Sequence, residues 1–179
     1  RVPRIGGAGT IAWLLVAGGL CASTLHLANP RKAWRAWSQW RTSWLSREAV
    51  VSLAFMPLAA LYVACWWWGA SPLLRAVLAF VILWLAWATL FCTAMIYASL
   101  KPIRQWHTRR VPVNFLLVGH ASGALVVAAV LRSHGVGATP WGLVALRWFV
   151  AAAIGKPEYW WFVRSGEHAI PIEPAIGVA

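Results

Sequence analysis

Residues 25–48 read LHLANPRKAWRAWSQWRTSWLSRE, and this stretch decides the fold because it separates two long apolar segments. It contains four Trp residues and five Lys or Arg residues, so it is too polar to enter a hydrocarbon core. One residue capable of acid–base chemistry stands near each end of the stretch, His26 and Glu48. If both flanking segments cross a bilayer, His26 and Glu48 lie at the same membrane surface.

The composition favours a membrane protein over a soluble one. Of the 179 residues, 61% are hydrophobic and only 11% are charged, and the mean hydropathy is +0.66. A soluble domain of this size carries far more charge. The apolar residues fall into blocks of about twenty, the length that spans a hydrocarbon core of ~30 Å as a helix. We therefore predict an all-α fold, a polytopic transmembrane helical bundle.

We predict one transmembrane domain over residues 1–179. Its five spans are expected at about 5–27, 48–69, 75–100, 112–131 and 141–162. Ser46 is a plausible N-cap for the second span. Two clusters of small residues predict close helix packing in the first and fourth spans: Gly6, Gly7, Gly9, Gly18 and Gly19, and Gly119, Ala121, Ser122, Gly123 and Ala124.

The linker at 30–47 has the pattern of an amphipathic helix lying in the membrane interface. Its Trp residues recur at intervals of three, three and four, which places them on one helical face: Trp34, Trp37, Trp40 and Trp44. Arg31, Lys32 and Arg35 fall on the other face. Arg41 falls within the Trp stripe, so we expect it to have a partner, which could be Glu48, a lipid phosphate or a ligand.

The net charge of +12 is explained by loop cations, and no nucleic-acid-binding motif is present, so we expect membrane lipid and not nucleic acid as a partner. If five spans alternate sides, ten cations face one side and four the other. The ten are Arg31, Lys32, Arg35, Arg41, Arg47, Lys101, Arg104, Arg109, Arg110 and Arg164, against Arg1, Arg4, Arg75 and Arg132. The positive-inside rule then places the His26 and Glu48 surface in the cytoplasm.

His26 and Glu48 together predict a quinone site, because quinone redox chemistry moves protons along with electrons. In this interpretation His26 binds a quinone oxygen and Glu48 passes protons to water. The alternative is an interfacial histidine with its hydrogen bonds satisfied, and a Glu48 that accepts helix-start N–H groups and pairs with Arg47 or Arg41. Tyr97, at the end of the third span, is either a quinone hydrogen-bond donor or an ordinary aromatic-belt residue.

Other ionisable residues give weaker indications. A haem needs two histidines at similar depth, whereas His120 lies deep in the fourth span and His26 at its edge, so His120 is interpreted as a packing histidine. Arg147, Lys156 and Glu158 in the fifth span form either a proton path or a structural ion pair. Cys21, Cys65 and Cys92 lie within apolar runs without a CxxC spacing, which predicts no metal or iron–sulfur site in this protein.

Two segments resemble the signature of the dimethyl-sulfoxide-reductase membrane anchors, the DmsC family, which is related to the NrfD-type anchors. The first is Leu25-His26-Leu27-x-x-Pro30-x-x-Ala33-Trp34 followed by Ser43-Trp44-Leu45-Ser46-Arg47-Glu48. The second is Met95-Ile96-Tyr97-Ala98-Ser99-Leu100-Lys101-Pro102. The resemblance covers essentially the whole chain.

This resemblance implies a membrane anchor outside the catalytic core of a molybdopterin oxidoreductase. Its partners would be an iron–sulfur electron-transfer subunit and a molybdopterin catalytic subunit, which carry the clusters and the molybdopterin. The anchor itself would hold no haem and would exchange electrons with ubiquinone or menaquinone. The family's quinone-site histidine and glutamate fall on His26 and Glu48. In our leading hypothesis, Arg41 and Tyr97 are second-line contacts of the quinone.

Family members have about eight spans, and the chain starts at Arg1 without an initiator Met, so we expect a fragment that covers spans two to six. The expected location is the bacterial inner membrane. A cytoplasmic site surface differs from the DMSO reductases and is similar to a branch that anchors cytoplasmic sulfite-oxidising molybdoenzymes and reduces quinone. The basic residues Lys101, Arg104, Arg109 and Arg110, with the Trp linker, would dock the iron–sulfur subunit.

Two other functions fit the sequence. One is a structural or assembly anchor without a redox site. The other is a small transporter, which would need broken helices or ionisable groups near the midplane of the bilayer.

Overall fold

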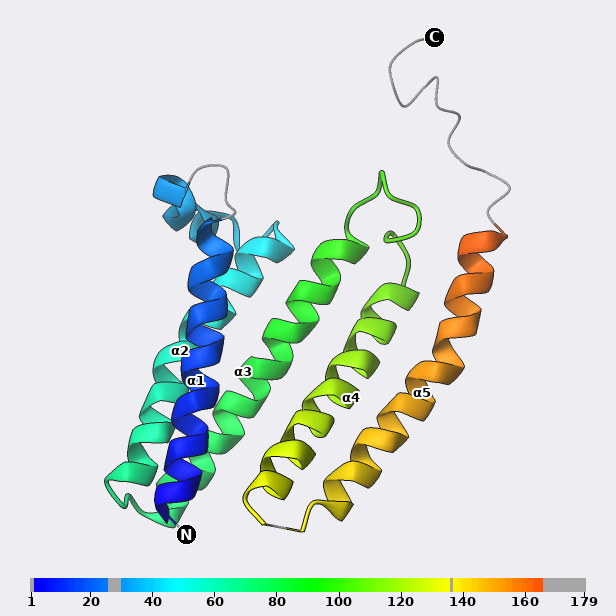
Figure 1. Ribbon diagram of the computed structural model, residues 1–179. Helices are drawn as coiled ribbons and strands as arrows, with labels where there is room; N and C mark the ends of the chain where they lie inside the picture. Colours follow the sequence, from blue (N-terminus) through cyan, green and yellow to red (C-terminus); the bar gives the residue numbers. More distant parts are fainter. Residues whose placement is uncertain (1, 26–29, 136, 166–179) are drawn as a thin grey trace. The chain divides into compact units, whose positions relative to one another are not determined.

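The computed structural model describes residues 2–25, 30–135 and 137–165 of the protein. Within these ranges the chain forms five α-helices and one 3₁₀ helix and contains no strand (Figure 1). In order they are α1 (Val2–Leu25), η1 (Pro30–Gln39), α2 (Trp44–Trp67), α3 (Pro72–Ala98), α4 (Arg110–Ser133) and α5 (Thr139–Arg164). The predicted all-α fold class is confirmed.

Three helices, α2, α3 and α4, are long and apolar enough to cross a membrane. In α1 the apolar segment is shorter and runs from Gly6 to Ala22. Helix α5 carries Arg147, Lys156 and Glu158, which lower its hydropathy. The chain is therefore a multi-pass membrane protein, and the crossing of the membrane by all five helices stays a prediction.

The helices form two compact units. Unit 1 comprises Arg1–Lys101 and includes α1, η1, α2 and α3, whereas unit 2 comprises Pro102–Ala179 and includes α4 and α5. In unit 1, α2 packs against both α1 and α3 and also contacts η1. In unit 2, α4 and α5 pack along each other.

Small residues let α1 approach α2 closely in unit 1. A Cβ added at Gly6 would lie 3.1 Å from Cε2 of Trp67, and one added at Gly9 would lie 3.3 Å from Cγ2 of Val63. The indole of Trp67 donates to Thr10 Oγ1 at 3.1 Å, which adds a polar contact to the same interface. Close packing is therefore confirmed at Gly6 and Gly9, but nothing described lies within 4 Å of a Cβ at Gly7, Gly18 or Gly19.

A second contact between α1 and α2 uses a backbone carbonyl beside a proline. Pro57 lies inside α2 and lacks an N–H, so the hydrogen-bond ladder of α2 is locally disturbed. Trp13 of α1 donates its indole N–H to the carbonyl of Met56, the residue before this proline, at 3.0 Å. The carbonyl that loses its helical donor to Pro57 is that of Leu53, four residues earlier, so the hydrogen bond from Trp13 adds a contact between the helices and does not replace the missing one.

Alanines line the contact between α4 and α5 in unit 2. Ala121 and Ala124 of α4 and Ala145 and Ala152 of α5 are all buried. The predicted small-residue cluster of the fourth span is thus confirmed at Ala121 and Ala124, whereas Gly123 and Ser122 are exposed.

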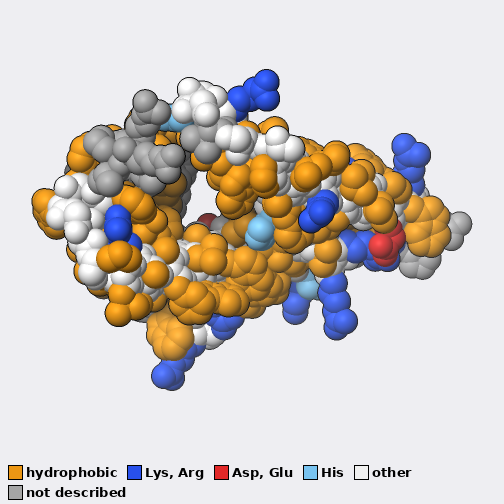
Figure 2. All heavy atoms as spheres, turned by 90° about the horizontal axis from the view of Figure 1, so that it is seen from below, with side chains coloured by type: hydrophobic (Ala, Val, Ile, Leu, Met, Phe, Trp, Pro, Cys, Tyr) orange, Lys and Arg blue, Asp and Glu red, His pale blue; other side chains and the backbone are white. Residues whose placement is uncertain are grey.

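Large apolar side chains point outward, as expected of helices that face lipid or further protein. Leu73, Phe80 and Ile154 are exposed by 74%, 63% and 72%, and no large side chain among the described residues is fully buried. Figure 2, which views the protein from below, shows that hydrophobic side chains are abundant on this face as well. In water such a surface would be costly, so the hydrocarbon core is its natural environment.

Candidate functional site

The start of α2 fixes the position of Glu48. Ser43 caps the helix, because its side chain accepts a hydrogen bond from the N–H of Ser46 at 3.4 Å. The prediction of Ser46 as the N-cap is therefore wrong: Ser46 lies within the first turn and is buried. Because α2 begins at Trp44, Glu48 lies beyond the free N–H groups of the helix start, so the expectation that it accepts their hydrogen bonds is also wrong.

Glu48 turns instead toward α3. Its carboxylate is half-buried, and Oε1 accepts a short hydrogen bond from Oγ1 of Thr93, a residue 45 positions further along the sequence. A carboxylate at the contact between two apolar helices has thereby found a neutral donor on the neighbouring helix. This hydrogen bond joins α2 to α3 and is the central polar contact of unit 1.

Thr93 belongs to a short polar row on α3. Its Oγ1 also lies 3.0 Å from the carbonyl oxygen of Thr89, one helical turn away. Thr89 in turn donates its hydroxyl to the carbonyl of Leu85 at 2.9 Å. On α2, Ser52 follows Glu48 by one turn and is buried at 8% exposure. Polar groups therefore continue from Glu48 along both helices, away from the helix ends.

Arg47 precedes Glu48 but does not pair with it. Its Nε donates to the carbonyl of Trp40 at 3.0 Å, and its Nη2 donates to the carbonyl of Arg41 at 2.7 Å. Its guanidinium also lies 4.2 Å from the ring centroid of Trp44. The alternative interpretation, in which Glu48 pairs with Arg47 or Arg41, is therefore wrong, since neither arginine forms an ion pair with it.

The Trp-rich linker is helical in its first part only. Helix η1 ends at Gln39, a turn follows, and Trp44 already belongs to α2. A 3₁₀ helix has three residues per turn, so Trp34 and Trp37 share one face, with exposed fractions of 69% and 51%. The position of this linker at a membrane interface stays a prediction.

Arg41 has a partner that the sequence analysis did not anticipate. Its guanidinium lies over the ring of Trp40, 5.4 Å from the centroid, and the side chain is exposed. The same arrangement recurs between Arg35 and Trp34 at 5.6 Å. A guanidinium group on an aromatic face still directs its N–H donors outward from its edge, where an oxygen ligand can accept them.

Tyr97 lies at the same end of the α2–α3 pair as Glu48. It follows Thr93 by four residues, so both side chains leave the same face of α3, with Tyr97 one turn nearer the end of the helix. Its exposed fraction is 39%. Glu48, Arg41 and Tyr97 therefore belong to segments that meet at one end of unit 1 (Figure 1), whereas His26, the fourth predicted site residue, lies outside the described residues.

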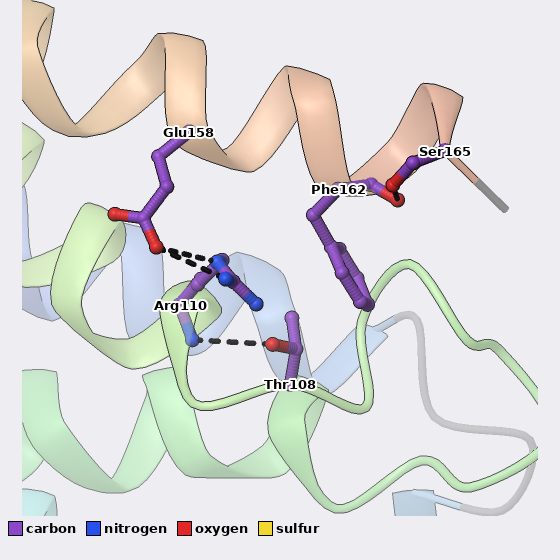
Figure 3. Close-up of polar contacts among 5 residues, drawn as sticks. All are labelled: Thr108, Arg110, Glu158, Phe162 and Ser165. Carbon is purple, nitrogen blue, oxygen red and sulfur yellow. Dashed lines mark hydrogen bonds and ion pairs between the residues drawn. The ribbon is translucent and has the colours of Figure 1, made fainter.

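The charged residues of unit 2 form a different kind of cluster (Figure 3). Arg110 at the start of α4 pairs with Glu158 of α5 through Nη2 and Oε1, 3.0 Å apart. The ring of Phe162 lies near two guanidinium groups, with Arg110 4.9 Å and Arg104 5.4 Å from its centroid. Of the two interpretations of the fifth-span charges, the structural ion pair is thus confirmed for Glu158, with Arg110 as its partner. Arg110, one of the predicted docking cations, is engaged in this pair.

His120 makes the contacts of a packing histidine. Its Nδ1 lies 2.7 Å from the carbonyl oxygen of Leu116 in the same helix, and its ring packs on Trp148 of α5 with centroids 4.9 Å apart. In the part of the protein that the structure describes, no three His, Cys, Asp or Glu residues are grouped so that they could hold a metal ion.

Two residues of this site were missed by the sequence analysis. Thr93 and Thr89 were not singled out, although two threonines four residues apart in an otherwise apolar run fall on one helical face. Arg47 was named only as a possible partner of Glu48, and its contacts to the linker carbonyls have no sequence signal.

Comparison with known proteins identifies relatives of one kind. A model of the DMSO reductase anchor subunit (DmsC) family matches residues 3–155. The C component of the sulfite dehydrogenase of Allochromatium vinosum is 43% identical over 130 residues, which make up 66% of this chain and 40% of that protein. The YnfH component of an anaerobic dimethyl sulfoxide reductase of Escherichia coli is 25% identical over 148 residues, 79% of this chain and 50% of that protein.

A further relative is the C component of the anaerobic dimethyl sulfoxide reductase of Escherichia coli, which is 26% identical over 125 residues, 69% of this chain and 44% of that protein. The chain thus spans about half the length of the curated relatives it matches. No solved structure matches the sequence.

Proposed function

The chain belongs to the DMSO reductase anchor subunit (DmsC) family, and on this premise we propose that it is the quinone-reactive membrane part of a molybdopterin oxidoreductase. In this role it exchanges electrons between a membrane quinone and an iron–sulfur subunit. That subunit in turn connects to the molybdopterin subunit on which the substrate reacts.

The observation that carries this proposal is the half-buried Glu48 at the α2–α3 contact. Burying a carboxylate in an apolar bundle is costly, and intramembrane ionisable groups are typically functional. Glu48 has no cation as a partner among the described residues, so a purely structural ion pair does not account for it. A carboxylate held by a neutral hydroxyl can accept and release a proton, which quinone chemistry requires.

The groups at this end of unit 1 fit a quinone. A quinone has a flat apolar ring and two carbonyl oxygens, and on reduction it takes up two electrons and two protons. The exposed guanidinium of Arg41 and the hydroxyl of Tyr97 are hydrogen-bond donors for such oxygens. Trp40 and Leu45, exposed by 52% and 54%, offer apolar surface for the ring. His26 remains the proposed ligand of one quinone oxygen.

Arg47 gives this site its shape. By donating to the carbonyls of Trp40 and Arg41, it ties the end of the linker to the first turns of α2. Arg41, which lies in the turn before α2, is thereby held close to the start of the helix that carries Glu48. A binding group that is fixed in advance costs less conformational entropy when its ligand arrives.

We also propose that exposed cations between α3 and α4 dock the iron–sulfur subunit. Lys101, Arg104 and Arg109 are exposed, and they lie in the segment that follows Tyr97. A cationic surface steers and orients an acidic partner. Charge bias across the predicted spans favours a position of these cations, together with Glu48, on the cytoplasmic side of a bacterial inner membrane.

The higher identity to a sulfite dehydrogenase component, 43% against 25% and 26%, favours a sulfite-oxidising complex that reduces quinone. Electrons would then flow from the molybdopterin subunit through the iron–sulfur subunit to the quinone.

Purification of the native complex tests this function. We expect an iron–sulfur polypeptide and a molybdenum-containing subunit to co-purify with the chain, and quinone reduction with sulfite as the electron donor. DMSO-dependent quinol oxidation would instead assign the reductase branch. A chain that purifies alone, without metals in the preparation, would refute the anchor role.

A structural anchor without a redox site is the second candidate, because the Glu48–Thr93 hydrogen bond also joins two helices. The variant E48Q separates the two functions, since a glutamine can still accept the hydrogen bond from Thr93 but cannot carry a proton. Assembly with loss of quinone turnover supports the redox site, whereas assembly with unchanged turnover supports the structural anchor.

A further inference from the structure

The hydroxyl of Thr93 lies between two acceptors. Its Oγ1 contacts Oε1 of Glu48 on one side and lies 3.0 Å from the carbonyl oxygen of Thr89 on the other. A threonine hydroxyl has one proton to donate and two lone pairs with which to accept. Thr93 can therefore donate fully to only one of its two neighbours at a time.

Each protonation state of Glu48 selects a different arrangement of these hydrogen bonds. When Glu48 is a carboxylate, Thr93 donates to it. When Glu48 is protonated, its own O–H can donate to Oγ1, and the hydroxyl of Thr93 then turns to the carbonyl of Thr89. Both arrangements use the same heavy-atom positions, so neither state leaves a polar group unpaired and the backbone does not have to move.

The surroundings make this adaptability valuable. Glu48, Thr93 and Thr89 are all half-buried between α2 and α3, and Cys92 and Ser52 nearby are buried. In such a low-dielectric environment an unpaired carboxylate or carboxylic acid is destabilised far more than in water. A residue that satisfies both forms lowers the barrier to proton uptake and release.

We propose that Thr93 is the positioning residue for proton transfer by Glu48, because it satisfies both the ionised and the protonated carboxyl by rotating one hydroxyl. The inference rests on the proposed function of Glu48 at the quinone site. Protons balance over two turns of a simple cycle. For each quinone reduced by two electrons from the iron–sulfur partner, Glu48 twice takes up a proton from the aqueous side and passes it to the quinone, and it then returns to its starting state.

Three substitutions test the proposal in the purified complex. T93V keeps the shape of the side chain and removes the hydroxyl, whereas T93S keeps a hydroxyl on a smaller side chain. T89V is the matched control, since it lies one turn away on the same helix. It loses only its own hydrogen bond to Leu85 and keeps the backbone carbonyl at position 89.

The first measurement is the infrared difference spectrum between acidic and alkaline pH, in which the Glu48 bands are identified by their loss in E48Q. We expect T93V to move the C=O stretching band of protonated Glu48 to higher frequency, because that carboxyl loses its acceptor. T93S and T89V should leave the band in the wild-type position. A band that does not move in T93V would overturn the proposal.

The second measurement is quinone turnover of the assembled complex. We expect T93V to lower kcat by about tenfold, as loss of a hydrogen bond to a charged group does, with KM for quinone nearly unchanged. T93S should restore most of the rate. Wild-type turnover in T93V would overturn the positioning role even if the band had moved.

The variant E48Q keeps the two proposals apart. If E48Q turns over normally, the proposed function of Glu48 fails, whatever the spectrum of T93V shows. If E48Q is inactive and T93V retains full activity, only the role of Thr93 fails. If the T93V complex does not assemble, the same spectra are recorded with T93A and T93C. The proposal then requires that T93A moves the band of protonated Glu48.

Discussion

The two glutamates in the described part of the protein occupy opposite environments. Glu158 is exposed by 64% in its side chain and forms an ion pair with Arg110, so its charge is compensated at the surface of unit 2. Glu48 is half-buried in unit 1, and its partner is the neutral hydroxyl of Thr93. A guanidinium group can only donate, so it pairs with the ionised carboxylate, whereas a hydroxyl can donate to a carboxylate or accept from a carboxylic acid. The comparison favours a structural role for Glu158 and a chemical role for Glu48.

Neutralising each glutamate in turn is the most direct test of the different roles of Glu48 and Glu158. We expect E48Q to lower the quinone turnover of the assembled complex by about 100-fold, because positioned proton transfer contributes at least that much. E158Q should leave turnover within about twofold of wild type, since loss of an exposed ion pair changes little. Turnover with a quinone analogue, normalised to the amount of assembled complex, measures both. Similar losses in the two variants would remove the distinction between them.

A second prediction concerns the arginines beside these glutamates. Arg110 is the partner of Glu158, whereas Arg47 holds the linker carbonyls of Trp40 and Arg41. A lysine at position 47 cannot reproduce the two guanidinium hydrogen bonds and the stacking on Trp44, so Arg41 is expected to lose its fixed position.

We therefore expect R47K to raise KM for quinone by about tenfold, the equivalent of one or two hydrogen bonds, while kcat changes little. The infrared band of Glu48 should stay in place, because Arg47 does not contact it. R35K is the control, since Arg35 also stacks on a tryptophan, Trp34, in the same linker. An unchanged KM in R47K, or a moved Glu48 band, would contradict this account.

The sequence was sufficient for the fold class and for the choice of Glu48 as a residue of interest. Long apolar blocks determine the all-helical membrane fold, because composition and length act locally along the chain. A single acid between the first residue and Glu158 stands out in such a sequence without any structural knowledge. The predicted close packing at small residues is confirmed where they face another described helix, as at Gly6, whereas at Gly18 no described atom lies within 4 Å of an added Cβ.

The partners of Glu48 could not be predicted from the sequence. Thr93 lies 45 residues away, and which residues of α3 meet Glu48 depends on the register with which two long helices pack. The first turn of α2 was also misplaced: both Ser43 and Ser46 are good N-caps, and the choice shifts Glu48 out of the first turn. In the alternative interpretation Arg47 was one of two possible partners of Glu48, but it donates instead to the carbonyls at the end of the linker.

The smallest expected effect is on the unfolding free energy, to which the Glu158–Arg110 ion pair and the Glu48–Thr93 hydrogen bond should contribute differently. In unit 2, E158Q removes an ion pair that is partly exposed at both ends, so we expect a loss of less than ~1 kcal/mol in unfolding free energy. In unit 1, T93V removes a hydrogen bond to a half-buried carboxylate, for which the expected loss is ~1.5–3 kcal/mol.

Salt separates the two contacts further. Salt screens exposed charges, so the loss of unfolding free energy in E158Q should vanish as salt is raised. The loss in T93V, at the apolar contact between α2 and α3, should persist. Denaturant unfolding of the full chain in detergent, at low and high salt, measures both. If E158Q proved the more destabilising variant, or if T93V were the salt-dependent one, then Glu158 and not Glu48 would be the carboxylate embedded in the helix packing. The assignment of roles to the two glutamates would then have to be reversed.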